Sequence, residues 1–172
     1  MKRLFVLAAF VFIAAIAANA QSKANFAGSW SLDKAKSQGL DQRMADADVT
    51  WAITQDDSKI TIESKVSGGQ APAGGGGRGP AGPRTYTLDG KEVTTEGGGQ
   101  MGGTNTTKAT WSGDGKTLEL NSVRAGSFNG NDFKATSIDK MSLSGDGKVL
   151  TVVRHSESPR GTTDSTWVFN KQ

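Results

Sequence analysis

Cysteine is absent from the 172 residues, and histidine and tyrosine occur once each. Without cysteine the chain can form no disulfide framework, no thiolate zinc site and no cysteine nucleophile. A single histidine, His155, excludes a metal centre built from several imidazoles and argues against a histidine-dependent catalytic triad. The sequence therefore predicts no metal site and no cofactor.

Long apolar runs are also scarce, and the one at the start of the chain covers residues 4–18, behind Lys2 and Arg3. It ends at Ala18-Asn19-Ala20, a small-x-small pattern that signal peptidase cleaves. The run is shorter than the roughly 20 residues that a membrane-spanning helix needs. We therefore predict a cleaved signal peptide over residues 1–20, export to the periplasm or the medium, and no membrane span after cleavage.

Cleavage would leave a nearly neutral chain. The leader holds two of the 20 basic residues and none of the 17 acidic ones, so residues 21–172 carry a net charge of 18 − 17 = +1. Nucleic-acid binding requires a clustered basic surface, which this balance does not favour. The remaining 172 − 20 = 152 residues are a usual size for a single domain.

This domain is predicted to be all-β. Short segments alternate apolar and polar residues and are separated by turns rich in Gly and Asp. Successive hairpins favour an antiparallel up-and-down meander, and closing it into a barrel of about eight to ten strands removes the exposed edges. A two-sheet β-sandwich is the alternative. The predicted strands cover residues 26–33, 48–55, 59–66, 84–89, 91–96, 106–112, 116–123, 134–143, 148–156 and 163–170.

The connections carry three further patterns. Residues 33–37 and 41–45 can each form a helical turn or two behind an Asp cap, which places a short helical segment after the first strand. Residues 67–83 and 97–103 are so rich in Gly that we expect mobile loops at the barrel ends. Ser-Gly-Asp-Gly-Lys occurs twice, starting at Ser112 and Ser144, and turn chemistry explains this repeat better than Ca²⁺ binding does.

The first predicted strand contains Gly28-Ser29-Trp30 directly behind the leader. Gly-x-Trp in this place resembles the lipocalin and calycin superfamily of ligand-binding barrels, including small exported bacterial lipocalin-like proteins. The resemblance implies that Trp30 closes the barrel floor, that Gly28 permits close packing, and that a basic residue near the last strand packs over Trp30. Lys171 is the matching candidate.

The strand count is also similar to that of the fatty-acid-binding branch, which has ten strands and a helical lid after the first. In that branch an Arg-x-Tyr motif near the last strand binds a carboxylate. Here Arg84-Thr85-Tyr86 lies on the fourth predicted strand instead. The carboxylate-binding residues of that branch therefore cannot be transferred to this chain.

Two arginines extend the inward faces of predicted strands. Leu118 and Leu120 mark the core face of residues 116–123, and a period of two continues that face to Arg124. The same period continues the inward face of residues 148–156 to Arg154. A guanidinium inside a barrel needs an anion or several acceptors.

We therefore predict that Arg154 and Arg124 bind the anionic head of a ligand, with Tyr86 and Trp111 lining the cavity. In the alternative, the arginines sit at the barrel rim or pair with an internal Glu. No catalytic constellation is found. His155 and Ser156 are adjacent strand residues that point to opposite faces, and no Gly-x-Ser-x-Gly elbow is present.

These features predict a non-catalytic binding protein for a small apolar or amphiphilic molecule, with a carboxylate as one candidate head group. The alternative is a protein-binding module with a filled barrel, such as an exported inhibitor or an envelope assembly factor. A connected interior volume of a few hundred Å³ would favour the small ligand.

Overall fold

The computed structural model describes residues 23–68, 82–96, 103–128 and 130–172. The predicted leader and most of the predicted Gly-rich loop 67–83 lie outside this part of the chain. The helix is α1 (Gln42–Asp46). The strands are β1 (Gly28–Leu32), β2 (Asp48–Gln55), β3 (Lys59–Ser67), β4 (Arg84–Thr87), β5 (Val93–Glu96), β6 (Thr104–Trp111), β7 (Thr117–Phe128), β8 (Asn131–Leu143), β9 (Val149–Ser158) and β10 (Gly161–Lys171).

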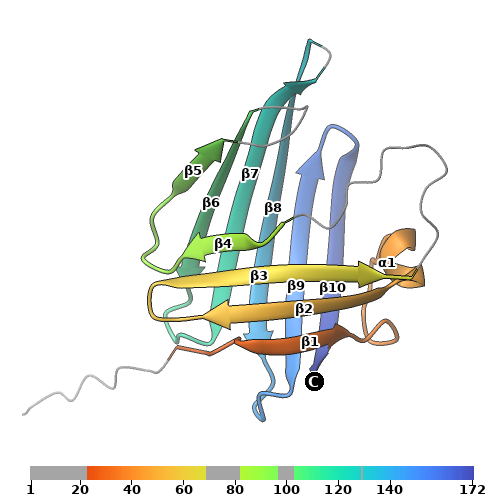
Figure 1. Cartoon of the computed structure of the whole chain (residues 1–172), viewed down its shortest axis with the longest axis vertical. Coiled ribbons are helices and arrows are strands. Elements are labelled where there is room, and N and C mark those ends of the chain that lie inside the picture. Colours follow the sequence, from red (N-terminus) through yellow and green to blue (C-terminus); the bar gives the residue numbers. More distant parts are fainter. Residues whose placement is uncertain (1–22, 69–81, 97–102, 129) are drawn as a thin grey trace, which may run out of the picture.

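The ten strands form one antiparallel sheet that curls into a nearly closed barrel, with the order β4-β3-β2-β1-β10-β9-β8-β7-β6-β5. The first and last strands meet, because β1 pairs with β10 and Leu32 lies opposite Phe169. Figure 1 shows β1–β4 crossing in front of β5–β10. The predicted barrel is confirmed, and the sandwich is excluded because the sheet runs unbroken through β1 and β10.

The remaining edges of the sheet are β4 and β5, which are consecutive in the chain. No ladder joins these two strands in the described residues, although β4 approaches β6 across the opening. We call this opening the seam. It leaves the barrel one hydrogen-bonded ladder short of full closure.

Most predicted strand bounds agree closely with the structure, and β2 agrees at both ends. The largest difference is the β7–β8 hairpin, where β7 continues to Phe128 instead of ending near residue 123. Residues 124–127 include Gly126 and offer little strand propensity of their own. The ladder to β8 supplies their hydrogen bonds, with Arg124 opposite Ala135.

One end of the barrel, here called the closed end, is filled by a packed apolar core. The segment before β1 crosses this end: the Phe26 N–H donates to Gln55 Oε1 at 2.9 Å, and Trp30 Nε1 donates to the Phe26 carbonyl at 2.9 Å. These bonds satisfy polar groups that would otherwise be buried without a hydrogen-bond partner. The largest fully buried side chains are Trp30, Trp51, Tyr86, Phe26, Phe169, Ile60, Ile62, Leu118, Leu120, Met141, Leu150 and Val49.

The Gly-x-Trp strand and the last strand contact each other at this closed end. Lys171 Nζ lies 5.4 Å from the centroid of the Trp30 ring, and the two residues are opposite in the ladder. Gly28 has φ 141°, and a Cβ there would meet Lys171 Cε at 3.2 Å. A side chain at this position would therefore strain the backbone and press on the lysine.

The repeated Ser-Gly-Asp-Gly-Lys segments form two turns with the same hydrogen bonds. Ser112 Oγ donates to Asp114 Oδ1 at 2.6 Å, and the Lys116 N–H donates to the same oxygen at 3.0 Å. The corresponding distances from Ser144 and Lys148 to Asp146 are 2.5 and 3.1 Å. The carboxylates are used by the turns themselves, so turn chemistry accounts for the repeat.

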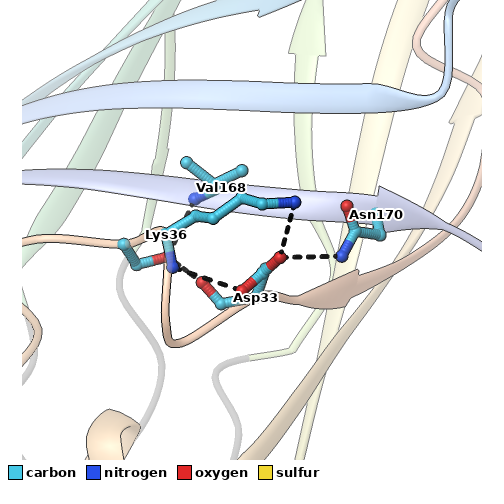
Figure 2. Close-up of polar contacts among 5 residues, drawn as sticks. Asp33, Lys36, Val168 and Asn170 are labelled. Atoms are coloured by element: carbon cyan, nitrogen blue, oxygen red, sulfur yellow. Dashed lines mark hydrogen bonds and ion pairs between the residues drawn. The ribbon is translucent and has the colours of Figure 1, made fainter.

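The chain after β1 continues along β10 as a hydrogen-bonded turn and extends the closure of the barrel. Figure 2 shows Asp33 bonded to Lys36 within the turn and to Asn170 on β10. Ser37 Oγ donates to the Asp33 carbonyl at 2.7 Å and accepts the Val168 N–H at 3.0 Å. Residues 33–37 thus form a turn, and the helix begins later.

The short helix α1 begins behind the predicted Asp cap. Asp41 Oδ1 accepts the Met44 N–H at 2.9 Å, the bond expected of an N-cap. Met44 and Leu40 pack against the apolar core. In the part of the chain that the structure describes, no helix has the length and apolar character needed to span a bilayer.

Candidate functional site: a cavity in the barrel

A cavity of about 870 Å³ occupies the end of the barrel opposite the closed end. Its walls come from β4 to β9, whereas the side chains of β1 and β2 and the α1 segment take no part. The lining residues are Gly82, Pro83, Arg84, Thr85, Tyr86, Thr87, Val93, Thr95, Glu96, Asn105, Thr107, Ser122, Arg124, Ala135, Thr136, Ser137, Arg154, Ser156, Glu157 and Ser158.

Both predicted arginines lie on the inward face of the barrel, the face that alternation along their strands predicts. On β7, Leu118 and Leu120 are buried in the core, and Arg124 lines the cavity on the same face. On β9, Val152 is buried and Arg154 lines the cavity. The inward stripes thus pass from the apolar core into the cavity without a bulge that would reverse them.

Arg154 pairs with an internal carboxylate. Its Nε and Nη2 donate to Asp139 Oδ1 and Oδ2, each at 2.5 Å, and the two residues are directly opposite on β9 and β8. Asp139 is only 2% exposed. The guanidinium carbon also lies 3.9 Å from the centroid of the Trp167 ring. This two-bond geometry fixes the plane of the guanidinium and gives the buried carboxylate its counter-charge.

A second arginine reaches Asp139 from the far side of the barrel. Arg84 Nη1 on β4 lies 3.9 Å from Asp139 Oδ2, and its guanidinium carbon lies 5.8 Å from the centroid of the Trp51 ring. Because β4 and β8 are not neighbours in the sheet, these side chains meet across the interior. They form a charged layer between the apolar core and the cavity.

Tyr86 completes this charged layer and lines the cavity as predicted. The residue is 2% exposed. Burial raises the pKa of its phenol above the ordinary value; Asp139 adds to that increase, and the charges of Arg84 and Arg154 oppose it. The phenol therefore stays protonated at neutral pH and remains a hydrogen-bond donor.

Arg124 is placed differently from the other two arginines. Its neighbours in the ladders are Asn105 and Ala135, which also line the cavity, and its guanidinium carbon lies 5.8 Å from the Phe133 ring. Among residues 23–68, 82–96, 103–128 and 130–172, no carboxylate lies within ion-pair distance of Arg124. A charged group facing the cavity without a counter-ion favours an anion.

Trp111 does not line the cavity. It lies at the closed end, where its ring stacks on Phe26 with a centroid distance of 6.0 Å and Lys23 Nζ lies 5.6 Å from its centroid. Trp111 lies at the last position of β6, beside the turn to β7, and that turn is at the closed end. Its position along the strand, which the sequence did not specify, decides which half of the barrel it occupies.

The cavity wall carries both signs of charge. Arg84, Arg124 and Arg154 line it together with the exposed Glu96 and Glu157, and the buried Asp139 adds a third carboxylate beneath, so the sum is 3 − 3 = 0. The charges are unevenly paired, because Asp139 lies between Arg84 and Arg154, whereas Arg124 has no ion-pair partner among the described residues. The described residues hold no group of three or more His, Asp or Glu side chains that could bind a metal ion.

Sequence reasoning missed Asp139 and Arg84, although the signal was present. Met141 is buried on β8, and a step of two residues places Asp139 on the same inward face. Likewise Arg84 shares the face of Tyr86 on β4. The phase rule that located Arg124 and Arg154 would have located both of these residues.

No protein-family model matches the chain, and no curated protein matches its sequence. The crystal structure of zebrafish ileal bile acid-binding protein in complex with cholic acid is similar, with 15% identity and a TM-score of 0.49. The match covers 86% of this chain and 98% of that one. The ten-stranded antiparallel barrel is established by the strand order described above.

Proposed function

We propose that the chain is an exported, non-catalytic protein that binds one small organic anion, a class that includes amphiphilic acids, in the barrel cavity. The observation that carries this proposal is the cavity of about 870 Å³ with three guanidinium groups on its wall, one of which, Arg124, has no ion-pair partner among the described residues. Cavities of several hundred Å³ with a few convergent charges are typical of small-molecule sites.

The arginines have different roles in this proposal. Arg154 donates two of its N–H groups to Asp139 and orients that carboxylate. Arg124, which has no ion-pair partner within the described part of the chain, is the first contact for the anionic head. Arg84 is 3.9 Å from Asp139 and can turn part of its fork to the ligand. Tyr86 supplies a neutral hydrogen-bond donor from the same wall.

The protein-binding module is the weaker alternative because it requires a filled barrel. Among the described residues only the closed end is filled, and the charged layer of Arg84, Tyr86, Asp139 and Arg154 marks where close packing stops. Export is proposed from the pattern of residues 1–20. Absence of catalysis is proposed because the adjacent His155 and Ser156 on β9 point to opposite faces of the sheet.

Titration with 1-anilinonaphthalene-8-sulfonate, a fluorescent amphiphilic anion, tests the proposal on the full chain after processing. We expect saturable binding of one probe per chain. Arg124→Gln should weaken it by about tenfold, because a hydrogen bond to a charged group contributes about 1.5–3 kcal/mol. Lys134→Gln is the matched control, since it removes one positive charge from an exposed position on β8.

Two results would contradict the proposal. One is the absence of saturable binding together with no small molecule in native mass spectra of the protein from its own host. The other is an equal loss of affinity in Arg124→Gln and Lys134→Gln, which would place the probe outside the barrel or make its attraction nonspecific.

A further inference from the structure

We infer that the ligand is a small hydroxylated oxyanion, of the sugar-acid or sugar-phosphate class, and that a fatty acyl chain is not the preferred occupant. This inference rests on the proposed function and specifies its ligand. Three features of the barrel interior carry it: the sealed apolar core, the hydroxyl groups of the cavity wall, and the guanidinium of Arg124, which has no ion-pair partner among the described residues.

The apolar part of the barrel has no room for an acyl chain. Its large side chains, such as Trp30, Phe169 and Leu150, are 0% exposed, so they face neither solvent nor the cavity. The charged layer lies directly above them, with Asp139 and Arg154 joined by two bonds. A tail that entered the core would have to displace both the packed side chains and this ion pair.

Half of the twenty residues that line the cavity are Ser, Thr or Asn. Its apolar members are few, and none is Leu, Ile, Met or Phe. The hydroxyl and amide groups on the wall include Asn105, Thr107, Ser122, Thr136, Ser137 and Ser156, all half-buried. An acyl chain would strip water from these groups and return no hydrogen bond, whereas ligand hydroxyls would replace that water.

Arg124 indicates the charged part of the ligand. It has no ion-pair partner among the described residues, and the planar fork of an arginine suits carboxylate and phosphate oxygens equally well. The exposed Glu96 and Glu157 lie on the same wall, so an anion gains most by placing its charged end near Arg124 and its hydroxyls toward the serines and threonines.

A paired hydroxyl contact allows a matched test of the hydroxyl requirement. Ser122 Oγ and Ser137 Oγ lie 2.9 Å apart on the cavity wall. Thr94 Oγ1 and Thr106 Oγ1 lie 2.9 Å apart on β5 and β6 but do not line the cavity. Ser→Ala at the first pair and Thr→Val at the second each remove two hydroxyls from one ladder without adding bulk, and only the first pair faces the proposed ligand.

Isothermal titration calorimetry with D-glucuronate, D-glucose 6-phosphate, D-glucose and dodecanoate tests the inference. We expect one or both sugar anions to bind about tenfold or more tightly than glucose and dodecanoate. The two sugar anions distinguish carboxylate from phosphate recognition. S122A/S137A should weaken sugar-anion binding by about tenfold, while T94V/T106V leaves it unchanged.

The outcomes distinguish failure of this inference from failure of the proposed function. Tighter binding of dodecanoate than of both sugar anions overturns the inference. Equal binding of glucose and the sugar anions does so as well. If the sugar anions fail to bind while the fluorescent anion binds in the cavity, the inference falls and the proposed function stands. If no probe binds at all, both fall together.

Discussion

At the scale of single residues, the interior is organised by one buried carboxylate. Asp139 receives two bonds from Arg154 and faces Arg84 from across the barrel, so one residue connects strands that the sheet keeps apart. An ion pair taken out of water seldom stabilises a fold by itself, but removing one partner leaves an uncompensated charge. The pair therefore acts mainly to hold the arginines in place.

Asp139→Asn should lower the free energy of unfolding by about 3 kcal/mol, because Arg154 would keep a largely buried charge without a counter-ion. Urea denaturation monitored by tryptophan fluorescence measures this change. The double variant Asp139→Asn/Arg154→Gln should recover much of the loss, since both charges are then absent. Asp132→Asn, at an exposed position on β8, is the control. A single variant as stable as the parent chain would refute this role.

At the scale of elements, the closure of the barrel depends on a short ladder with a reinforced end. β1 pairs with β10 at three positions in the ladder, Trp30, Ser31 and Leu32. The turn that follows prolongs the contact: the Asp33 N–H donates to the Val168 carbonyl at 2.7 Å, and Gln38 forms a bridge to Thr166. The connection after β1 therefore adds hydrogen bonds to β10 beyond the three-residue ladder.

This turn predicts a specific acid sensitivity. The hydrogen bond from Asn170, then those from Lys36, hold the pKa of Asp33 below its ordinary value. A carboxyl with a depressed folded-state pKa stabilises the fold above its unfolded pKa, about 3.9, and loses that contribution as the pH falls through the folded value. Asp33→Asn should therefore lose less stability on acidification than the parent chain.

The measurement is the urea midpoint at about pH 6 and at about pH 2.5, which lie above and below the unfolded pKa of about 3.9. Lys36→Gln should show part of the same effect, because Lys36 Nζ lies 3.1 Å from Asp33 Oδ2. An Asp33→Asn chain that loses as much stability in acid as the parent would show that other carboxylates account for the sensitivity.

At the scale of the whole molecule, the barrel has a packed end, a hollow end and one seam without a ladder. The seam lies between β4 and β5, both four residues long, whereas β7 and β8 pair along twelve positions. Cavity-lining residues come from both sides of the seam. Strands at the edges of a sheet have one hydrogen-bonded neighbour, so they open at lower free energy than strands within it.

Native-state hydrogen exchange should reveal this difference in local opening free energy between edge and central strands. We expect the amides of β4 and β5 to exchange roughly two to three orders of magnitude faster than those at the centre of β7 and β8. A saturating cavity ligand should slow exchange on β4 more than on β2, because β4 lines the cavity and β2 does not. Uniform protection across all ten strands would indicate that the seam is closed in solution.

Local pattern was enough to predict a large part of this architecture. The period of two and the Gly-Asp turns located ten strands, and the phase of Leu118 and Leu120 placed Arg124 on the inward face. The bounds of β7 were harder to predict, since residues 124–127 owe their strand conformation to pairing with β8. Local preference fixes the face a residue takes, but a partner strand fixes how far the ladder runs.

The sequence by itself determined the strand order along the chain, the inward direction of Arg124 and Arg154, and the chemistry of the two repeated turns. Only the tertiary structure decided that Asp139 neutralises Arg154, that Arg84 reaches the same carboxylate, and that Trp111 belongs to the closed end. The physical reason is that alternation reports which face of a sheet a side chain takes. Its height in the barrel and its partners across the interior depend on curvature and closure, which no local pattern encodes.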